Sequence, residues 1–314
     1  MDTSILSKSP IYIYNKDFNK GGIWLIEIIF RKNEDAKDFY EYLQLYLASS
    51  ALSNHILHFE DQHIVKMNIE SNGKGYTDII KNAFFQFIIK GKQDHWFRRI
   101  LADHYYYVDE EEQQQILEII HSILEGNRED LAVFVSELDV EKYIREAINQ
   151  IFQESSTFSF DSFVKFRMRP LMDQMAKYVE ISIDEYKMEQ EYQMFIQTLR
   201  DFLSSREAKL AEIHLLIDDG IHFFDDQYDE IKRSDLTRMI DRKLLFNHPV
   251  YVDSRTIAPL LSIAPTSIYL YAEDMEQPLV RTIHNIFEER LILVPIAKFY
   301  DSKRQFSFIL DEKI

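Results

Sequence analysis

The sequence predicts an α+β fold in which two mixed segments flank a helical one, and three observations lead to this expectation. Apolar residues alternate along short runs near both ends of the chain, which is the spacing of strands. Between Trp96 and Lys209 they recur with the spacing of an amphipathic helix. Only 7 glycines and 7 prolines occur among 314 residues, so long regular elements are favoured over loops.

The first segment, residues 1–92, reads as a small β-α-β-β-α unit. Its elements, in order, are IWLIEIIF, DAKDFYEYLQLYLASS, HILHFE, HIVKMNIE and TDIIKNAFFQFIIK. Only a few polar residues around Asp61 and Gln62 separate the second and third strands, so we expect these strands to pair as a hairpin. This order corresponds to half of a ferredoxin-like sandwich.

The second segment, residues 93–206, reads as helical. Asp109 can cap a helix whose first turn is acidic, and Gly126 can end that helix. Ser136 or Asp139 can cap the next helix. A long helical run then starts near Phe160, and a break or kink is expected at Pro170, because proline disfavours helical geometry in the residue before it.

The third segment, residues 207–314, reads as an α/β unit. AEIHLLIDDGIHFFDD alternates like a strand on both sides of Asp219-Gly220, a turn dipeptide, so we expect a hairpin. Helices follow around 234–243 and 253–262. SIYLY, the helix QPLVRTIHNIFEE and LILVPI then have the length of a βαβ crossover, which predicts parallel strands. QFSFIL reads as a final strand.

Composition excludes several classes of site. The chain has no cysteine, so disulfides, thiolate catalysis and cysteine zinc sites are impossible. SNGKGYTD lacks the spacing of a phosphate loop, His55, His58 and His63 do not share one strand face, and the acidic run from Asp218 to Glu230 does not match an EF-hand. We therefore expect no metal site and no cofactor.

The chain reads as a cytoplasmic protein. Its start lacks the apolar core of a secretion signal, and no apolar run nears the roughly 18 residues of a membrane span. The net charge is −17, and residues 108–206 alone hold 10 basic and 21 acidic side chains. Nucleic acid is disfavoured as a partner, because a polyanion is normally bound by a basic surface. A basic protein fits this charge better.

A small cationic cluster stands out against this acidity. FDSFVKFRMRPLMDQM places Lys165, Arg167 and Arg169 on alternate positions between aromatic and sulfur side chains. One interpretation is an anionic ligand or RNA, with phenylalanines as a stacking platform. The other, which we prefer, places Phe163, Phe166 and Met168 in the core and pairs Arg167 or Arg169 with a carboxylate of the middle segment.

The chain also resembles a known family. FVKFRMRPLMDQMAKYVEISIDEYKMEQEYQMFIQTLRDFL followed by KLAEIHLLID resembles the YtxC family of sporulation proteins of endospore-forming bacteria. IEIIF with AKDFYEYL, and LLSIAPTSIYLY with IFEERL, resemble its two ends, so the similarity runs from about Trp24 to Val294. The resemblance implies a cytoplasmic, sporulation-associated protein, and it supplies no catalytic residue because the family has no known activity.

The sequence therefore favours a protein that works through protein contacts. One rival is an enzyme with a pocket between its units, although no catalytic motif is present. A second is nucleic-acid binding through a basic face that includes Arg98, Arg99, Lys232, Arg233, Arg238, Arg242 and Lys243. The candidate structural or interaction residues are Lys165, Arg167, Arg169, Glu110, Glu111 and Glu112.

Overall fold

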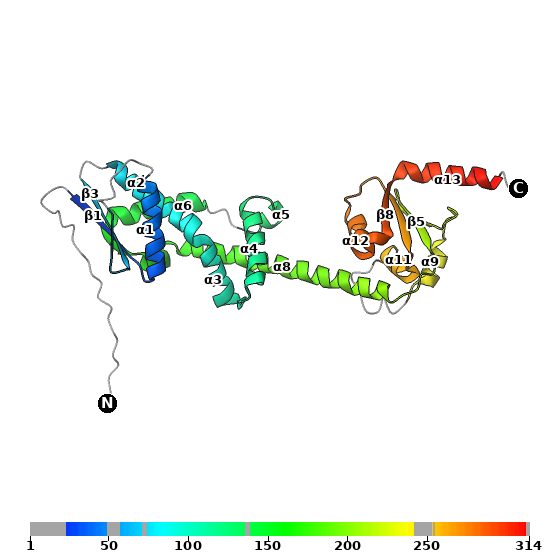
Figure 1. The fold of residues 1–314 in the computed structure, drawn as a ribbon, viewed down its shortest axis with the longest axis horizontal. Helices are drawn as coiled ribbons and strands as arrows, with labels where there is room; N and C mark the ends of the chain where they lie inside the picture. Colours follow the sequence, from blue (N-terminus) through cyan, green and yellow to red (C-terminus); the bar gives the residue numbers. More distant parts are fainter. Residues whose placement is uncertain are drawn as a thin grey trace, which may run out of the picture. The chain divides into compact units, whose positions relative to one another are not determined.

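The structure, a computed structural model, describes residues 23–48, 57–70, 74–135, 139–241, 253 and 255–311 (Figure 1). Helices together with two four-stranded sheets confirm the α+β fold. The chain divides into two compact units, Met1–Lys187 (unit 1) and Met188–Ile314 (unit 2), and the boundary falls within helix α8. The three-segment division expected from the sequence stays a prediction.

Unit 1 begins with the predicted β-α-β-β-α order. Its elements are β1 (Ile23–Ile29), α1 (Asn33–Ala48), β2 (Leu57–Glu60), β3 (Ile64–Glu70), α2 (Lys74–Gln86), the π-helix η2 (Phe87–Lys92), α3 (Gln93–Tyr105), α4 (Glu110–Leu124), α5 (Glu129–Ala132), α6 (Val140–Glu154), β4 (Thr157–Ser159), α7 (Phe160–Arg167) and the first part of α8 (Arg169–Ser204). The hairpin of β2 and β3 is confirmed, and Asp61 and Gln62 turn it with positive φ angles of 49° and 61°.

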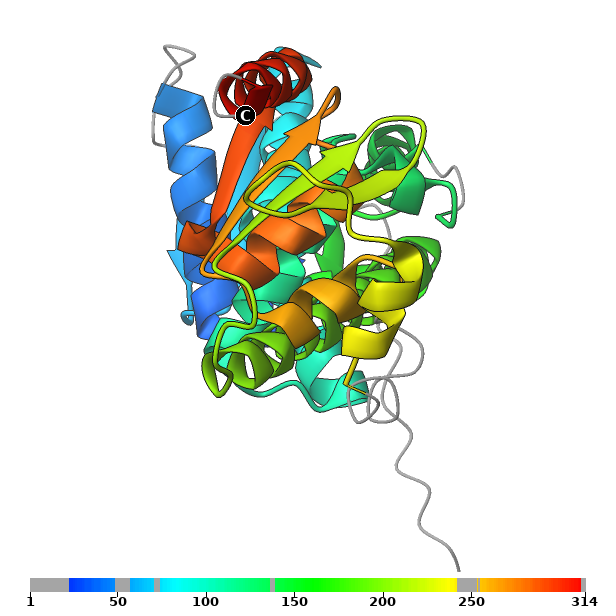
Figure 2. The same ribbon diagram turned by 90° about the vertical axis from the view of Figure 1, so that its right-hand side faces the viewer.

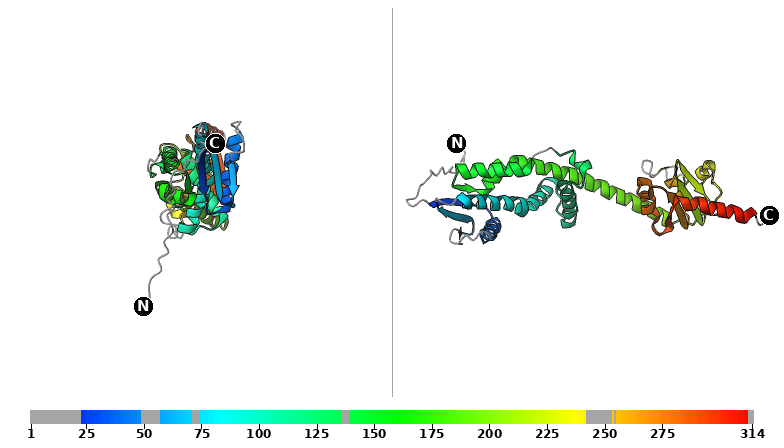
Figure 3. Two further views of the ribbon diagram at one scale, coloured as in Figure 1. Left: turned by 90° about the vertical axis from the view of Figure 1, so that its left-hand side faces the viewer. Right: turned by 90° about the horizontal axis from the view of Figure 1, so that it is seen from above.

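The sheet of unit 1 has the order β2-β3-β1-β4, and Figure 3 (right) shows unit 1 from above. Sequence reasoning missed β4, which is only three residues long and lies parallel to β1. A ferredoxin-like unit would place this strand antiparallel to β1, because a single helix after β3 would return the chain parallel to β3. Here several helices separate β3 from β4, so the direction of β4 is reversed.

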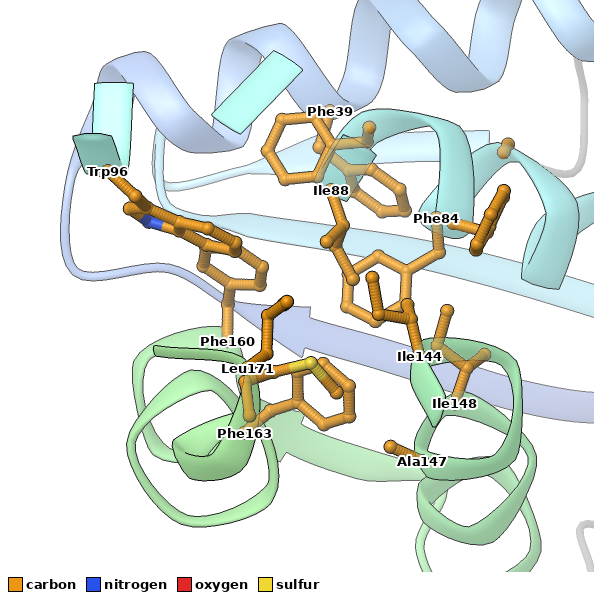
Figure 4. Packing of buried hydrophobic residues seen from close by; sticks show 14 of the residues in the cluster. Phe39, Phe84, Ile88, Trp96, Ile144, Ala147, Ile148, Phe160, Phe163 and Leu171 are labelled. Atoms are coloured by element: carbon orange, nitrogen blue, oxygen red, sulfur yellow. The ribbon is translucent and has the colours of Figure 1, made fainter. Parts of the chain in front are cut away.

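An aromatic core fills the space between this sheet and the helices. Phe84 of α2 lies at its centre, with ring centroids 5.3 Å from Phe39 of α1 and 5.4 Å from Phe163 of α7. Figure 4 shows Phe84 and Ile88 pointing toward side chains of α6 and α7. The helices that follow the sheet in sequence are thus packed onto it by phenylalanine rings.

The predicted helix ends of unit 1 are confirmed. The side chain of Asp109 accepts hydrogen bonds from the backbone N–H groups of Glu111 and Glu112, and Gly126, with φ 79°, follows the end of α4. Asp139 caps α6, whereas Ser136 lies outside the described residues. The predicted break separates α7 from α8 at Met168, so two helices form there.

Unit 2 continues from the second part of α8. Its elements are β5 (Glu212–Ile217), β6 (Ile221–Phe224), α9 (Arg233–Met239), α11 (Ile257–Ile263), β7 (Ser267–Ala272), α12 (Pro278–Phe287), the 3₁₀ turn η3 (Glu288–Arg290), β8 (Leu291–Pro295) and α13 (Ile296–Asp311). The sheet order is β6-β5-β7-β8 (Figure 2). The predicted hairpin of β5 and β6 and the parallel pairing of β7 with β8 are both confirmed.

The predicted final strand QFSFIL is wrong, because these residues lie within helix α13. A short apolar run cannot distinguish a strand from a helix by its spacing alone. The contacts of α13 decide here: Phe299 and Lys303, one turn apart, both pack near the ring of Phe224, with centroid distances of 4.8 and 4.4 Å. The helix thereby covers part of one face of the sheet, next to Leu216 and Tyr271.

Candidate functional site

The three cations of the predicted cluster do not converge. The guanidinium of Arg167 donates to Oε1 of Gln150 at 3.1 Å and pairs with the Glu154 carboxylate. Nε of Arg169 lies 4.0 Å from the carboxylate of Asp173 on its own helix. Lys165 lies over the ring of Phe166. Arg167 therefore has a carboxylate partner in the middle segment, which fits a structural role for this one cation.

The predicted core of this region is partly wrong. Phe163 and Met168 are buried, as expected, but the side chain of Phe166 is 72% exposed. Phe160 and Phe163 share the buried face of α7, and with 3.6 residues per turn Phe166 has rotated away from it. The alternation of cations and aromatic residues in the sequence does not show which face of the helix each residue occupies, so Phe166 was wrongly expected in the core.

The exposed ring of Phe166 borders a hollow of about 500 Å³ in unit 1. Its lining residues are Tyr143, Glu146, Ala147, Gln150, Phe166, Arg167, Arg169 and Pro170. The hydroxyl of Tyr143 donates to the Arg167 carbonyl at 2.6 Å, and burial raises the pKa of this tyrosine. Among the lining residues no carboxylate lies within ion-pair distance of a guanidinium, so the hollow presents no paired acid and base.

Glu110, Glu111 and Glu112 lie at a second feature, the connection from α3 to α4. We call this feature the acidic corner and define it as residues 106–112. The backbone of Tyr106 is left-handed, with φ 63°, and its N–H donates to the Leu101 carbonyl, which ends α3. Asp109 then caps α4, so the three glutamates occupy the first turn of that helix, where its dipole favours negative charge.

Most carboxylates of the acidic corner face solvent without a cation. Among the described residues, no lysine or arginine lies within 4.0 Å of the carboxylates of Glu110, Glu111 and Glu112. The hydroxyl of Tyr186 lies 3.5 Å from Glu112, and Arg98 contacts the neighbouring Gln113 and Gln114 amides. The corner is therefore a region of uncompensated negative charge.

Two carboxylates of α8 extend this negative region. Burial raises the pKa of Tyr105, and the carboxylates of Glu180 and Asp184 raise it further. Burial likewise raises the pKa of Tyr107, with contributions from Glu112 and Asp184. Both effects place α8 carboxylates close to the end of α3.

Sequence reasoning selected the three glutamates but missed the apolar side chains beside them. Tyr106 is 83% exposed and Val108 is 77% exposed. The signal was present in the run HYYYVDEEE, in which apolar and aromatic residues directly precede an acidic helix start. What the sequence did not reveal is the left-handed turn that directs the chain at Tyr106 outward.

The basic residues considered for nucleic acid are divided between the two units, and several of them pair with carboxylates. Arg99 pairs with Asp103, and Arg238 pairs with Asp235, each on its own helix. Arg98 and Arg99 belong to unit 1 and Lys232, Arg233 and Arg238 to unit 2, while Arg242 and Lys243 lie outside the described residues. These contacts neutralise part of the positive charge that a phosphate backbone would need.

The described ranges hold no group of three or more histidine or acidic side chains arranged to bind a metal ion. Within the same ranges, no helix combines the length and apolarity needed to cross a bilayer.

The fold and these surfaces define a two-unit α+β protein with an exposed acidic and aromatic corner. Comparison with known sequences places it more narrowly. The YtxC-like family matches residues 78–292, so the chain belongs to that family, as the resemblance implied. It is similar to the uncharacterized protein YtxC of Bacillus subtilis (strain 168), with 34% identity over 281 residues, 89% of this chain and 97% of that protein. No solved structure matches the chain.

Proposed function

We propose that the protein is a cytoplasmic, sporulation-associated protein that acts through protein contacts, and that the acidic corner binds a basic protein partner. Membership of the YtxC-like family supports the cellular context, since that is what the resemblance implied. The geometry of the corner supports the mode of action. From the distribution of acidic side chains we propose a contact region from Asp109 to Glu191, and the exposed side chains of Tyr106 and Val108 directly before it belong to the same surface.

The observation that carries this proposal is the exposure of Tyr106. A tyrosine in the left-handed region is strained, and glycine or asparagine is usual where a helix ends in this way. Tyrosine is also one of the residue types enriched among the side chains that dominate binding energies at protein interfaces. An exposed aromatic ring on a strained backbone, beside uncompensated carboxylates, therefore fits a role in binding a partner better than a role in stabilising the fold.

The corner combines the two parts that such an interface needs. Tyr106 and Val108 supply apolar surface that a partner can cover. The surrounding carboxylates attract a basic segment and orient it before contact, which mainly raises the association rate. Because the charges lie at the surface, binding should weaken between roughly 0.1 and 0.5 M salt, over which the Debye length contracts about twofold.

The test uses a photo-reactive amino acid at position 108 of the full chain, expressed in sporulating cells. After irradiation of the cell lysate we expect it to be cross-linked to a basic protein. No cross-link should form when the lysate is irradiated in 0.5 M salt, nor with Tyr106→Gly or the triple variant Glu110→Lys, Glu111→Lys, Glu112→Lys. The matched control is Glu207→Lys, Glu273→Lys, Asp301→Lys, which changes the net charge equally with exposed carboxylates of unit 2.

The control decides between a docking surface and a general effect of charge. Equal loss of the cross-link in both triple variants would mean that net charge alone attracts the partner. A partner that is acidic, that maps outside residues 106–191, or that resists high salt would also contradict the proposal. In these cases the acidic corner contributes to solubility only.

A further inference from the structure

The two sheets have four edge strands, and three of them are protected against pairing with other chains. Strand β4 is only three residues long, and β2 carries Glu60 in an ion pair with Lys66. Strand β6 is covered by the chain that follows it: N–H of Ile231 donates to the Phe223 carbonyl at 2.8 Å. Short length, charge and a covering segment are the usual means by which proteins block edge pairing.

Strand β8 lacks these protections. Its sequence, LILVP, contains no charged residue, and the part of the chain that the structure describes provides no strand beside its outer edge. Pro295 removes one donor, but only at the last position. Ile292 and Leu293 are each 41% exposed. Because successive side chains of a strand point to opposite faces, Ile292 and Leu293 leave apolar surface partly exposed on both faces of the sheet at this edge.

We propose that β8 pairs antiparallel with β8 of a second copy of this chain, so that two four-stranded sheets become one continuous sheet. An uncovered apolar edge is a template for another strand. A twofold axis makes such a contact self-complementary, since each copy presents the same strand to the other. All five residues can pair only if the central residue, Leu293, lies opposite itself.

The charges next to β8 favour a second copy over an unrelated strand. Glu289 precedes the strand and Lys298 follows it, both are exposed, and neither has an ion-pair partner among the described residues. In an antiparallel pair the start of one strand lies beside the end of the other. Glu289 of each copy would then approach the partner's Lys298, which gives two favourable charge contacts across one short interface.

The contact should be weak and dependent on concentration. A five-residue strand buries much less surface than a stable dimer usually needs, and the net charge of −17 opposes association at a distance. We therefore expect a reversible monomer–dimer equilibrium in sedimentation of the full chain. Leu293→Lys should shift it at least tenfold toward monomer, whereas Leu45→Lys, which alters a leucine 71% exposed on α1, should not.

A covalent trap tests the register directly. Because the chain contains no cysteine, Leu293→Cys introduces a single thiol, which the twofold axis would place opposite its copy within reach of a disulfide. Mild oxidation should give a covalent dimer for Leu293→Cys and not for Leu45→Cys. Lys298→Glu should weaken the dimer, and adding Glu289→Lys should restore it.

Other outcomes would overturn the proposal. A wild-type chain that stays monomeric at all concentrations, or equal disulfide formation at positions 45 and 293, would exclude pairing of two β8 strands. Failure of the charge swap to restore association would exclude the antiparallel register. None of these results depends on the acidic corner, which lies in unit 1.

Discussion

Nδ1 of His214 lies 2.9 Å from the hydroxyl of Tyr271, in the buried layer between the sheet of unit 2 and α13. The imidazole stacks on the ring of Tyr228, with a centroid distance of 4.2 Å. Its Nε2 lies 3.0 Å from the Glu212 carboxylate, a contact that favours the protonated imidazole. Burial lowers the pKa of His214, although Glu212, Asp225 and Asp226 oppose this effect.

The lowered pKa of His214 predicts that unit 2 loses stability in acid. The unfolded chain binds a proton to this histidine below about pH 6.5, whereas the folded chain resists it, so protonation favours unfolding as the pH falls. Unfolding free energies measured by denaturant at pH 7.5 and 5.5 should show a larger loss for wild type than for His214→Phe, which keeps the stacked ring. Equal losses would show that His214 takes up no proton when the chain unfolds, so that its pKa in the folded protein is not lowered.

Lys92 is a second buried ionisable group that sequence reasoning did not select. It ends the π-helix η2, its side chain is only 6% exposed, and Nζ lies 2.7 Å from Asp35 and 3.1 Å from Asp38 of α1. A widened helical turn of this kind redirects the side chains that follow it. The pairing joins η2 to the start of α1.

Lys92→Met should therefore destabilise the protein by about 1 to 3 kcal/mol, since it leaves a partly buried carboxylate without its partner. Lys37→Met, at an exposed position that contacts Glu41 at 3.8 Å, should change stability by less than about 0.5 kcal/mol. Thermal unfolding of both variants gives the comparison. If Lys92→Met is as mild as Lys37→Met, the two aspartates are well enough solvated to do without the lysine.

The cations before and after the α7–α8 break should differ in their effect on stability. Arg167 is 30% exposed and contacts Gln150 and Glu154, whereas Arg169 is 79% exposed and its ion-pair partner among the described residues is Asp173 at 4.0 Å. We expect Arg167→Met to cost about 1 kcal/mol and Arg169→Met less than about 0.5 kcal/mol. Denaturant titration of both variants tests this. If neither variant changes the unfolding free energy but both lose binding of an anion, the cluster is a ligand site.

These residues also show how far the sequence could predict the structure. Helix caps such as Asp109 and the turn at Asp61 were predictable, because they depend on local chemistry that the sequence displays. The position of Phe166 and the helical state of QFSFIL were not, because each depends on which face of a short element meets a core built from distant residues. The sequence did not single out His214 and Lys92 for a similar reason, because Tyr271 and Asp35, which they contact, lie far away in sequence.

The last prediction concerns the strain at Tyr106. Glycine adopts a left-handed backbone without steric cost, so Tyr106→Gly should raise the unfolding free energy by about 0.5 to 1 kcal/mol while it abolishes partner binding. Tyr106→Ala is the matched control, because it removes the same exposed ring but keeps a Cβ in the strained conformation. It should lose binding equally without the gain in stability.

Measured together, these two variants separate folding from function at one position. A tyrosine that is costly to the fold and required for binding is the pattern expected of an interface residue. If Tyr106→Gly destabilises the protein, the ring makes folding contacts that outweigh the backbone strain. If both variants bind normally, the acidic corner recognises its partner through charge alone, and removing its carboxylates should then be sufficient to abolish the complex.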